Sequence, residues 1–461
     1  MAAPTLPPGP KGNYLIGSLL DYARDPLDFM VRCSREYGDV VRLRMAGLPL
    51  YLLSHPDHAE YVLVKDHRNF VKSRYFRREL SFLGQGLLTS EGELWRRQRR
   101  LAQPAFHRRR VGAYGEAMVS HAERMLATWR DGEARDVHQE MRRLTLGIVA
   151  EVLFGAEKDK ADEVGEILGW LDKHANRLEE QGSAMVARFF LGNLPTPVNL
   201  RFRKGIGRLD EIIYGLIRER REDGEDTGDL LSMLLRFRDE GGAPISDKQL
   251  RDEVLTLLLA GHETTALALS WTWHLLSRNP EAEAKLLQEL QEVLEDRAPT
   301  VEDLPRLSYA EMVIKESMRL YPPAWGVSRE AIAACEIGGY RVPAGTQLLI
   351  VLWAMHRDPR YFEDPEVFDP TRWEGTRAMR VPRYAYLPFG AGPRVCIGST
   401  FAMTEAILLL AAIAKEFRLE LVPEQRRVIP QPSTTLRPRE GMRMLLRRRY
   451  PSARPTLEQR V

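Results

Sequence analysis

The residues best suited to chemistry lie in the glycine-rich segment FGAGPRVCIG, residues 389–398. Gly390, Gly392 and Gly398 surround Cys396, and glycines at this density let a backbone approach a large flat group closely. A helix is predicted to begin directly after Cys396, where its N-terminal amides would stabilise a thiolate. No second cysteine lies nearby for a zinc site or a redox pair, and the stretch lacks the dinucleotide pattern G-x-G-x-x-G. The segment predicts either one reactive thiolate or a tight turn around an ordinary buried cysteine.

The segment AGHETT, residues 260–265, places polar side chains inside an otherwise apolar helical stretch. Its His262-Glu263 pair resembles the start of the zinc-protease helix signature, in which a second histidine follows four residues later. That position is Ala266, so a zinc ion would lack its second ligand, and we assign His262 no metal. The Thr264 hydroxyl either bonds back to a carbonyl within a core helix or takes part in chemistry beside it.

Five residues of the glycine-rich segment carry a family resemblance. Phe389, Gly392, Arg394, Cys396 and Gly398 reproduce F-x-x-G-x-R-x-C-x-G, which resembles the haem-ligand loop of the cytochrome P-450 family. Other motifs of that family occur in order, and the resemblance runs from about residue 4 to about residue 448. They are W-x-x-x-R at Trp95 and Arg99, AGHETT at 260–265, E-x-x-R at Glu316 and Arg319, and DPTRW around Arg372.

The resemblance implies a haem site built around Cys396. This cysteine would be the axial ligand of the iron, a ligation that favours O–O bond cleavage. The cofactor would be noncovalent haem b, because the sequence has no C-x-x-C-H attachment motif. Phe389, Gly392 and Gly398 would shape the loop, and Ala260 would face the cofactor from the long helix. The haem carboxylates, which are costly to bury unpaired, are expected to bind Trp95, Arg99, Arg329 and Arg394.

The same resemblance places AGHETT on the oxygen side of the haem. Gly261 would let the helix open locally and make room for oxygen, as helices do where water or side chains insert. Thr264 and Glu263 would handle the protons that drive O–O cleavage. The pocket walls would come from 74–89, from 257–264, from 324–327 and from 433–436, which are mainly apolar.

Three residues are expected to be structural. Glu316 and Arg319 lie three apart and share a helix face. Arg372 would join them in a planar, bidentate network that holds the segment before the haem loop. An E-x-x-R pair alone is a surface pair in most proteins, so its spacing from Cys396 carries this prediction.

Helical periodicity dominates the elements that must position these residues. Ser246 and Gln249 have capping-box spacing at the start of a stretch that stays helical for about thirty residues, until Asn279-Pro280. Further helices are predicted over 115–130, 138–154, 161–180, 205–222, 281–295, 309–320 and 398–416. Strands are predicted over 39–45 and 50–54 as a hairpin, over 340–352 as a second hairpin, and over 441–449. We therefore expect a mainly α protein with small β-sheets, the cytochrome P-450 fold. It would form one domain over residues 1–461, with a Pro-rich lead over 1–12 and a polar tail over 450–461.

Composition narrows the function classes. The chain of 461 residues is 44% hydrophobic and 28% charged, which is typical of a globular protein and not of a disordered one. Its net charge of +3 is too balanced to indicate nucleic-acid binding. No apolar run reaches the length of a membrane span. Three cysteines give no disulfide framework, which fits a reducing cytoplasm. We expect a cytoplasmic monomer.

Together these patterns predict a haem-thiolate monooxygenase. It would hydroxylate or epoxidise a hydrophobic small molecule, a fatty acid or a terpenoid-like compound, with O2. Electrons would come from a separate ferredoxin or flavodoxin and its reductase, because no flavin or iron–sulfur domain follows Cys396. The alternative is a haem-binding sensor or redox protein without turnover. A peroxide-driven enzyme is disfavoured, because it should lack the Thr264–Glu263 pair.

Overall fold

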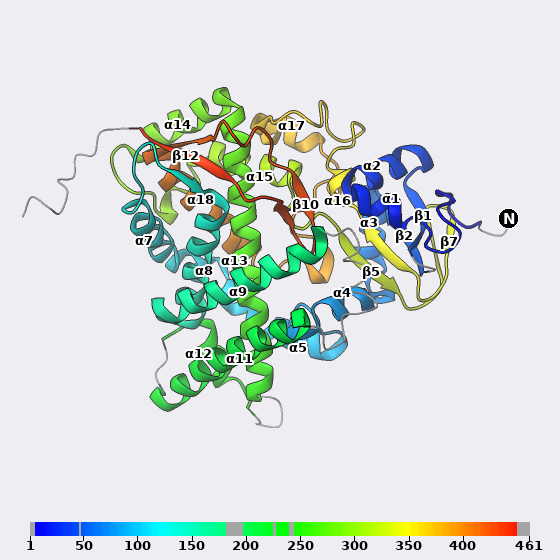
Figure 1. Ribbon diagram of the computed structural model, residues 1–461, viewed down its shortest axis with the longest axis horizontal. Coiled ribbons are helices and arrows are strands. Elements are labelled where there is room, and N and C mark those ends of the chain that lie inside the picture. The colour runs from blue at the N-terminus through cyan, green and yellow to red at the C-terminus, as the bar shows by residue number, and fades with distance from the viewer. Residues whose placement is uncertain (1–4, 46–47, 181–196, 225–226, 239–243, 450–461) are drawn as a thin grey trace, which may run out of the picture.

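The computed structural model describes residues 5–45, 48–180, 197–224, 227–238 and 244–449 (Figure 1). The predicted polar tail over 450–461 lies outside these residues, as do the first four residues of the Pro-rich lead. Residues 6–12 of the lead are irregular, as predicted.

Helices make up most of the described chain. The first half holds α1 (Leu19–Arg24), α2 (Pro26–Tyr37), α3 (Pro56–Glu60), α4 (Arg74–Glu79), α5 (Gly92–Ala102), α6 (Arg108–Ala113), α7 (Gly115–Leu126), α8 (Val137–Phe154), α9 (Lys158–Glu180) and α11 (Pro197–Asp223). The second half holds α12 (Leu230–Arg236), α13 (Asp247–Arg278), α14 (Pro280–Leu294), α15 (Ser308–Leu320), α16 (Leu352–Met355), α17 (Gly375–Arg380) and α18 (Ser399–Glu416). The seven helices predicted outside the central stretch correspond to α7, α8, α9, α11, α14, α15 and α18, with ends shifted by up to eight residues.

Helix α13 is the central element, and it runs through the middle of the molecule (Figure 1). The Ser246 side chain caps its start by accepting from the Gln249 amide at 3.2 Å. It ends at Arg278, before Asn279-Pro280, as the sequence predicts. Most of its length is buried, and Trp271 within it stacks on Tyr321 with ring centroids 4.2 Å apart. Because α8, α15 and α18 pack around it, α13 can hold side chains at fixed positions deep inside the protein.

The strands form small sheets, the largest of which lies on the side of the molecule that holds the N-terminus (Figure 1). Its order is β1 (Val40–Met45), β2 (Leu48–Leu53), β8 (Gln347–Ile350), β5 (Val327–Ala331) and β3 (Phe70–Lys72). Strands β1 and β2 are antiparallel, which confirms the first predicted hairpin. The other sheets join β4 (Ala134–Asp136), β12 (Arg443–Arg448) and β9 (Phe417–Leu421); β6 (Cys335–Ile337) and β7 (Tyr340–Val342); and β10 (Pro430–Pro432) and β11 (Leu436–Pro438). Strand β12 matches the strand predicted over 441–449.

The second predicted hairpin, over 340–352, is wrong. Its two halves, β7 and β8, belong to different sheets: β7 pairs with β6, whereas β8 lies between β2 and β5. The turn at Pro343-Ala344-Gly345 is present, but the buried strand β8 pairs with β2 and β5 rather than with β7, its neighbour in the chain. Its four residues are largely buried, and pairing on both sides satisfies their backbone groups better than a two-stranded ribbon would.

Candidate functional site

The loop that carries Cys396 is held closed by backbone hydrogen bonds. The Cys396 amide donates to the Phe389 carbonyl at 2.9 Å, and the Val395 amide donates to the Gly392 carbonyl at 3.0 Å. Gly392 has φ +71°, and a Cβ there would lie 1.9 Å from the Leu63 carbonyl oxygen. Only glycine fits this close approach, so Gly392 is required where the loop packs on the segment that follows α3.

Cys396 is an exposed cysteine three residues before α18, whereas Cys33 is buried and Cys335 half-buried. Neighbouring protein atoms raise the pKa of its thiol by desolvation, but the Gly398 amide and Arg99 lower it. Arg99 also donates to the Val395 carbonyl at 2.8 Å, beside the cysteine. The Gly398 amide at the start of α18 is thus placed as the sequence predicted and Arg99 adds to its effect, but desolvation outweighs both, and the net shift of the Cys396 pKa is upward although the residue is exposed.

A cluster of cations lies around the residues predicted to bind the haem carboxylates. Lys72 of β3 and Arg329 of β5 stand opposite each other in the sheet register, where like charges repel. Arg394 pairs with Glu91, donates to the Phe70 carbonyl at 2.7 Å, and lies 5.3 Å from the Trp95 ring centroid. The structure therefore brings Trp95, Arg99, Arg329 and Arg394 to one region, as predicted, and adds Lys72 and Glu91.

These cations carry more charge than their protein partners balance. Burial first, and then neighbouring Arg394, lower the pKa of Arg329 to about 10. Burial lowers the pKa of Lys72 to about 7, although its ammonium donates to the Leu87 and Ser90 carbonyls at 2.9 and 2.8 Å. Glu91 is the carboxylate that directly pairs with the cluster, so an additional anion bound there would stabilise it.

In α13 the segment 259–264 interrupts a buried helix. Ala260 is exposed, whereas the helix is buried from Leu250 to Leu258 and from Thr265 to Leu276. The Thr264 hydroxyl donates to the Ala260 carbonyl at 2.8 Å, which is the back-bonding arrangement that the sequence left as one alternative. Ala260 and Thr264 therefore mark the part of α13 that borders open space.

The local opening predicted at Gly261 is not seen in this structure, where helix α13 is continuous through this residue. A Cβ at Gly261 would meet Val149 of α8 at 3.2 Å, so the close packing of α8 on α13 also favours glycine here. That Gly261 makes room for oxygen stays a prediction. Buried His262 also has contacts that explain its position. Its Nδ1 is hydrogen-bonded to the Leu258 carbonyl at 2.9 Å, and the Thr145 hydroxyl of α8 donates to the backbone carbonyl of His262 at 2.8 Å.

Glu263 is held in an ion pair that the sequence did not reveal. Arg437 of β11 pairs with its carboxylate, and the Thr435 hydroxyl donates to it at 2.9 Å. Burial alone would raise the pKa of Glu263, but Arg437, together with His262 and Arg142, lowers it to about 2. The carboxylate is therefore ionised and locked, and it can accept a proton near neutral pH only when Arg437 moves away.

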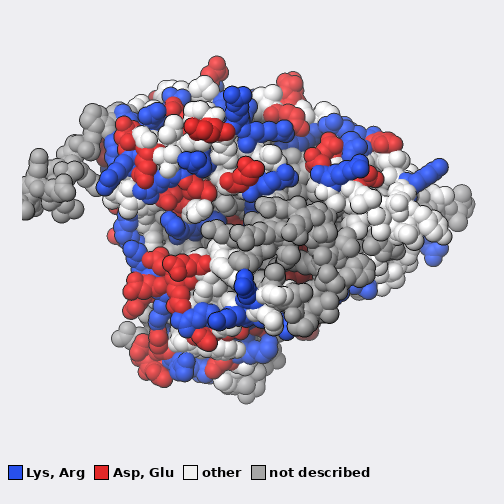
Figure 2. Space-filling view, viewed as in Figure 1, with Lys and Arg blue, Asp and Glu red and all other residues white. Residues whose placement is uncertain are grey.

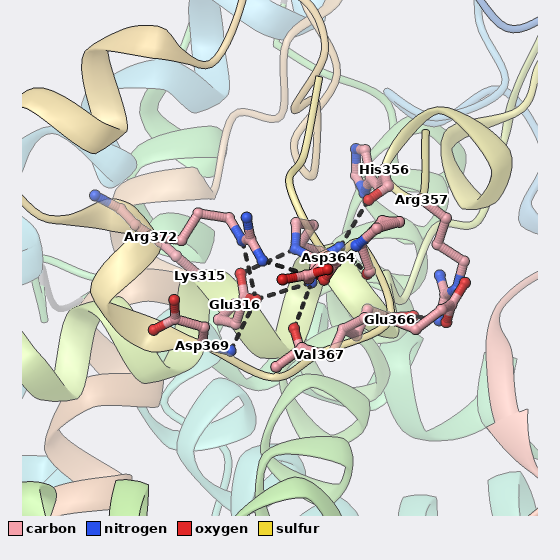
Figure 3. Close-up of polar contacts among 12 residues, drawn as sticks. Lys315, Glu316, His356, Arg357, Asp364, Glu366, Val367, Asp369 and Arg372 are labelled. Carbon is pink, nitrogen blue, oxygen red and sulfur yellow. Dashed lines mark hydrogen bonds and ion pairs between the residues drawn. The ribbon is translucent and has the colours of Figure 1, made fainter. Parts of the chain in front are cut away.

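The predicted structural network is present, and its central pair is fully buried. The side chains of Glu316 and Arg319 are both 0% exposed, and Arg319 donates to the carboxylate with Nε at 2.9 Å and Nη2 at 2.8 Å. Arg372 Nε reaches Glu316 at 3.4 Å, a long contact. Trp373 Nε1 donates at 3.0 Å and the Asp369 amide at 3.1 Å, which the sequence did not predict. Figure 3 shows how these groups tie α15 to the segment that runs from Asp364 to Arg372.

The four segments predicted to form pocket walls converge at α13 and β11. The Trp325 ring donates to the Ser433 carbonyl at 2.7 Å, Thr434 donates to Glu79 at 3.1 Å, and the Leu87 amide donates to Glu253 at 3.0 Å. With the Thr435–Glu263 bond, these contacts join 74–89, 324–327 and 433–436 to the central helix. A separate surface cavity of about 320 Å³, lined by Asp39, His55, Asp57, His58 and their neighbours, includes none of the predicted site residues.

Comparison with known proteins identifies the family. The family model for cytochrome P450 matches residues 7–446. Cyclooctatin synthase of Streptomyces melanosporofaciens is 41% identical over 438 residues, covering 94% of this chain and 92% of the relative. Cyclooctat-9-en-7-ol 5-monooxygenase of the same organism is 41% identical, covering 89% and 88%. Pentalenene oxygenase of Streptomyces avermitilis is 37% identical, covering 89% and 90%. The loop around Cys396, the central helix and the buried Glu316 network thus belong to a haem-thiolate monooxygenase, and the chain is a member of the cytochrome P-450 family.

Proposed function

We propose that the chain binds haem b between the Cys396 loop and α13, with Cys396 as the axial ligand. The donor set fits this group: one exposed thiol faces open space, and Ala260 borders open space on the central helix. When bound, haem supplies an iron that activates dioxygen, and thiolate ligation favours O–O cleavage. Desolvation raises the pKa of Cys396, and the Gly398 amide and Arg99 offset part of that rise, so these two groups are the ones in the loop that favour the anionic sulfur that ligation needs.

The excess of positive charge in this region is the observation that carries this proposal furthest. Buried Lys72 and half-buried Arg329 and Arg394 lie around Glu91, the carboxylate that pairs with Arg394, and Trp95 offers a further donor beside Arg394. Two haem carboxylates would neutralise this excess, and they would remove the repulsion between the paired Lys72 and Arg329.

We propose that Thr264 and Glu263 handle protons on the oxygen side. Thr264 lies at the open part of α13, and its hydroxyl can exchange the Ala260 carbonyl for a polar group in the pocket. Glu263 is one residue away, and its proton affinity depends on Arg437. Proton transfer by such positioned groups contributes about 10²–10⁴-fold to catalysis in enzymes generally.

The proposed substrate is a terpenoid-like hydrophobic molecule. The names of two relatives, pentalenene oxygenase and cyclooctat-9-en-7-ol 5-monooxygenase, support this class, and so do the mainly apolar walls. A fatty acid is the second candidate, because Arg77 Nε of α4 is buried without a partner among the described residues. An arginine there would suit a substrate carboxylate.

Electrons are proposed to come from an acidic ferredoxin or flavodoxin and its reductase. Arg96 and Arg100 of α5 are exposed, as are Arg426 and Arg427. Arg108 and Arg109 add exposed charge next to Phe106, whose ring contacts the Cβ position of Gly398 at 3.7 Å, in the Cys396 loop. Charge of this kind steers weak electron-transfer encounters. Arg97, by contrast, lies over the Phe237 ring at 5.8 Å.

We further propose that the protein works as a single-domain monomer in the cytoplasm. The largest of three clusters of buried apolar residues among the described residues draws on the chain from Leu80 to Leu446, which supports one domain. None of the helices in the described ranges is long and apolar enough to cross a membrane. On the face shown in Figure 2, basic and acidic side chains are interspersed rather than gathered into one large patch.

Oxygen incorporation tests the proposed function. The haem-loaded protein would be screened for substrate-induced spin-state shifts with terpenoids, fatty acids and fatty-acid methyl esters. It would then be incubated with the responding compound, a surrogate ferredoxin and reductase, and isotopically labelled dioxygen. We expect a terpenoid to respond and its product to gain one labelled oxygen atom. A haem-loaded protein that transfers no oxygen to any class would indicate the sensor or redox alternative, and a response to acids but not esters would favour the fatty acid.

A further inference from the structure

Glu405 is a buried acid that no motif assigned to the site. It lies on α18 and is 0% exposed, and neither carboxyl oxygen has a partner at full hydrogen-bonding geometry among the described residues. The nearest polar side chain that acts on it is Thr265 of α13, whose hydroxyl makes a long hydrogen bond to the Gly261 carbonyl at 3.3 Å. An ionised carboxylate in such a place would be costly, because nothing replaces its hydration.

The position of Glu405 links both sides of the candidate site. Helix α18 begins at Ser399, three residues after Cys396, and Glu405 follows six residues later, about 9 Å along the helix. Thr265 directly follows Thr264 and Glu263 on the central helix. Glu405 thus lies where the helix after the cysteine loop packs on the helix of the oxygen side.

No charged neighbour compensates Glu405. Burial raises its pKa to about 8, and the Thr265 side chain alone offsets this rise. No charged group of α6, α7, α13, α14 or α15, the described helices packed on α18, contributes to the shift. On α13, the titratable groups next to Thr265 are engaged elsewhere: His262 with the Leu258 carbonyl, and Glu263 with Arg437.

We propose that Glu405 is a redox-linked proton site: it takes up one proton from solvent when an electron enters the haem, and releases it on oxidation. The step balances, because the donor's electron reduces the cofactor while the Glu405 carboxylate and one proton form the neutral carboxylic acid. The physical cause is simple electrostatics. A negative charge added at a separation of about 10 Å and an effective dielectric constant of about 20 would favour the neutral acid by about tenfold in its proton equilibrium.

This inference rests on the proposed haem site, but not on the proposed substrate. In this proposal Glu405 compensates the negative charge that reduction adds to the protein interior, and it is not a catalytic residue. Because its pKa lies near 8, the coupling should be absent at pH 6 and appear near pH 8. Because reduction raises the proton affinity of Glu405 about tenfold, the wild-type reduction potential should fall with pH mainly between about pH 8 and about pH 9, by at most about half a proton per electron, and level off above that range.

The experiment is a spectroscopic redox titration of the haem-loaded protein from pH 6 to pH 10. For wild type we expect a pH-independent midpoint below about pH 7 and a falling midpoint above pH 8, as burial of Glu405 implies. Glu405→Gln, which is neutral and nearly isosteric, should give a flat midpoint over the same range. Thr265→Val removes the hydroxyl that lowers the pKa, so the onset of the slope should move to higher pH.

Two results would overturn the inference: the same pH-dependent slope in Glu405→Gln as in wild type, or a flat wild-type midpoint. If Glu405→Gln fails to retain haem, the Thr265→Val variant decides the question. A pH-dependent slope that begins at the same pH in Thr265→Val as in wild type would then contradict the inference. A reduced-minus-oxidised infrared difference spectrum at pH 9 adds a direct readout. It should show a protonated carboxyl band in wild type. Failure of the substrate proposal would leave all of these readouts unchanged, because none requires turnover.

Discussion

Replacing Glu316 by alanine should destabilise the protein strongly, because its fully buried carboxylate is the hub of a hydrogen-bonding network. It accepts hydrogen bonds from Arg319, Arg372, Trp373 and the Asp369 amide. Glu316→Ala leaves the Arg319 guanidinium buried without its counter-charge, a change that costs about 3–5 kcal/mol. Arg319 keeps three carbonyl partners at 2.6–3.0 Å, so we expect a value near the lower end of that range.

The same helix offers a matched control. Glu311 and Lys315 form an i,i+4 pair at 2.6 Å with side chains 40% and 36% exposed, and Glu311→Ala should cost about 0–1 kcal/mol. Equilibrium urea unfolding of the haem-loaded proteins is followed by circular dichroism. The difference in the free energy of unfolding between each variant and wild type is the shift in the urea midpoint multiplied by an m-value common to the proteins. Haem loss should accompany unfolding at lower urea in Glu316→Ala. Equal costs for the two variants would refute the reasoning that burial makes this pair structural.

Three further predictions concern catalysis and electron supply. Thr264→Ala should retain haem but divert reducing equivalents to peroxide, measured as peroxide formed per reductant consumed; unchanged coupling would remove Thr264 from proton delivery. Arg437→Ala should cost about 3 kcal/mol at pH 7 and free Glu263. Because Glu263 has a lowered pKa, wild type should lose this stabilisation as pH falls from about 4.5 to about 2, whereas the variant should show no such loss. Arg100→Glu should slow reduction by an acidic ferredoxin and weaken its salt dependence, measured by stopped-flow absorbance. Arg24→Glu, on α1, is the control, and equal rates in the two variants would contradict the docking surface.

Local patterns predicted the parts of the molecule that neighbouring residues determine. The long central helix follows from its cap at Ser246 and its stop at Asn279-Pro280, and both ends agree with the structure. The loop around Cys396 follows from glycines whose spacing allows the backbone to approach Leu63. The E-x-x-R pair shares a helix face because its residues are three apart, but its structural role was predicted from the family resemblance and from its spacing to Cys396.

Long-range contacts explain what the sequence did not predict. Arg437 lies 174 residues from Glu263, and no periodicity connects them. Lys72 became part of the cation cluster only because β3 pairs with β5. Gly261 packs against Val149 of another helix, so its role could not be separated from local flexibility. The second hairpin failed for the same reason: β8 pairs with distant strands rather than with its neighbour in the chain. The only sign of Glu405 in the sequence is a charged residue within an apolar helical stretch, a pattern that indicates a buried acid.

The assignment of Cys396 as the haem ligand is the central claim, and the absorbance spectrum of the reduced carbon monoxide complex tests it most directly. Wild type should show the red-shifted Soret band of thiolate ligation, and Cys396→Ser should lose it. Cys335→Ser is the matched control, because this half-buried cysteine lies on β6, outside the glycine-rich loop, and the variant should keep the band. The account would be contradicted if Cys396→Ser kept the red-shifted Soret band. It would also be contradicted if Cys335→Ser lost the band while Cys396→Ser kept it.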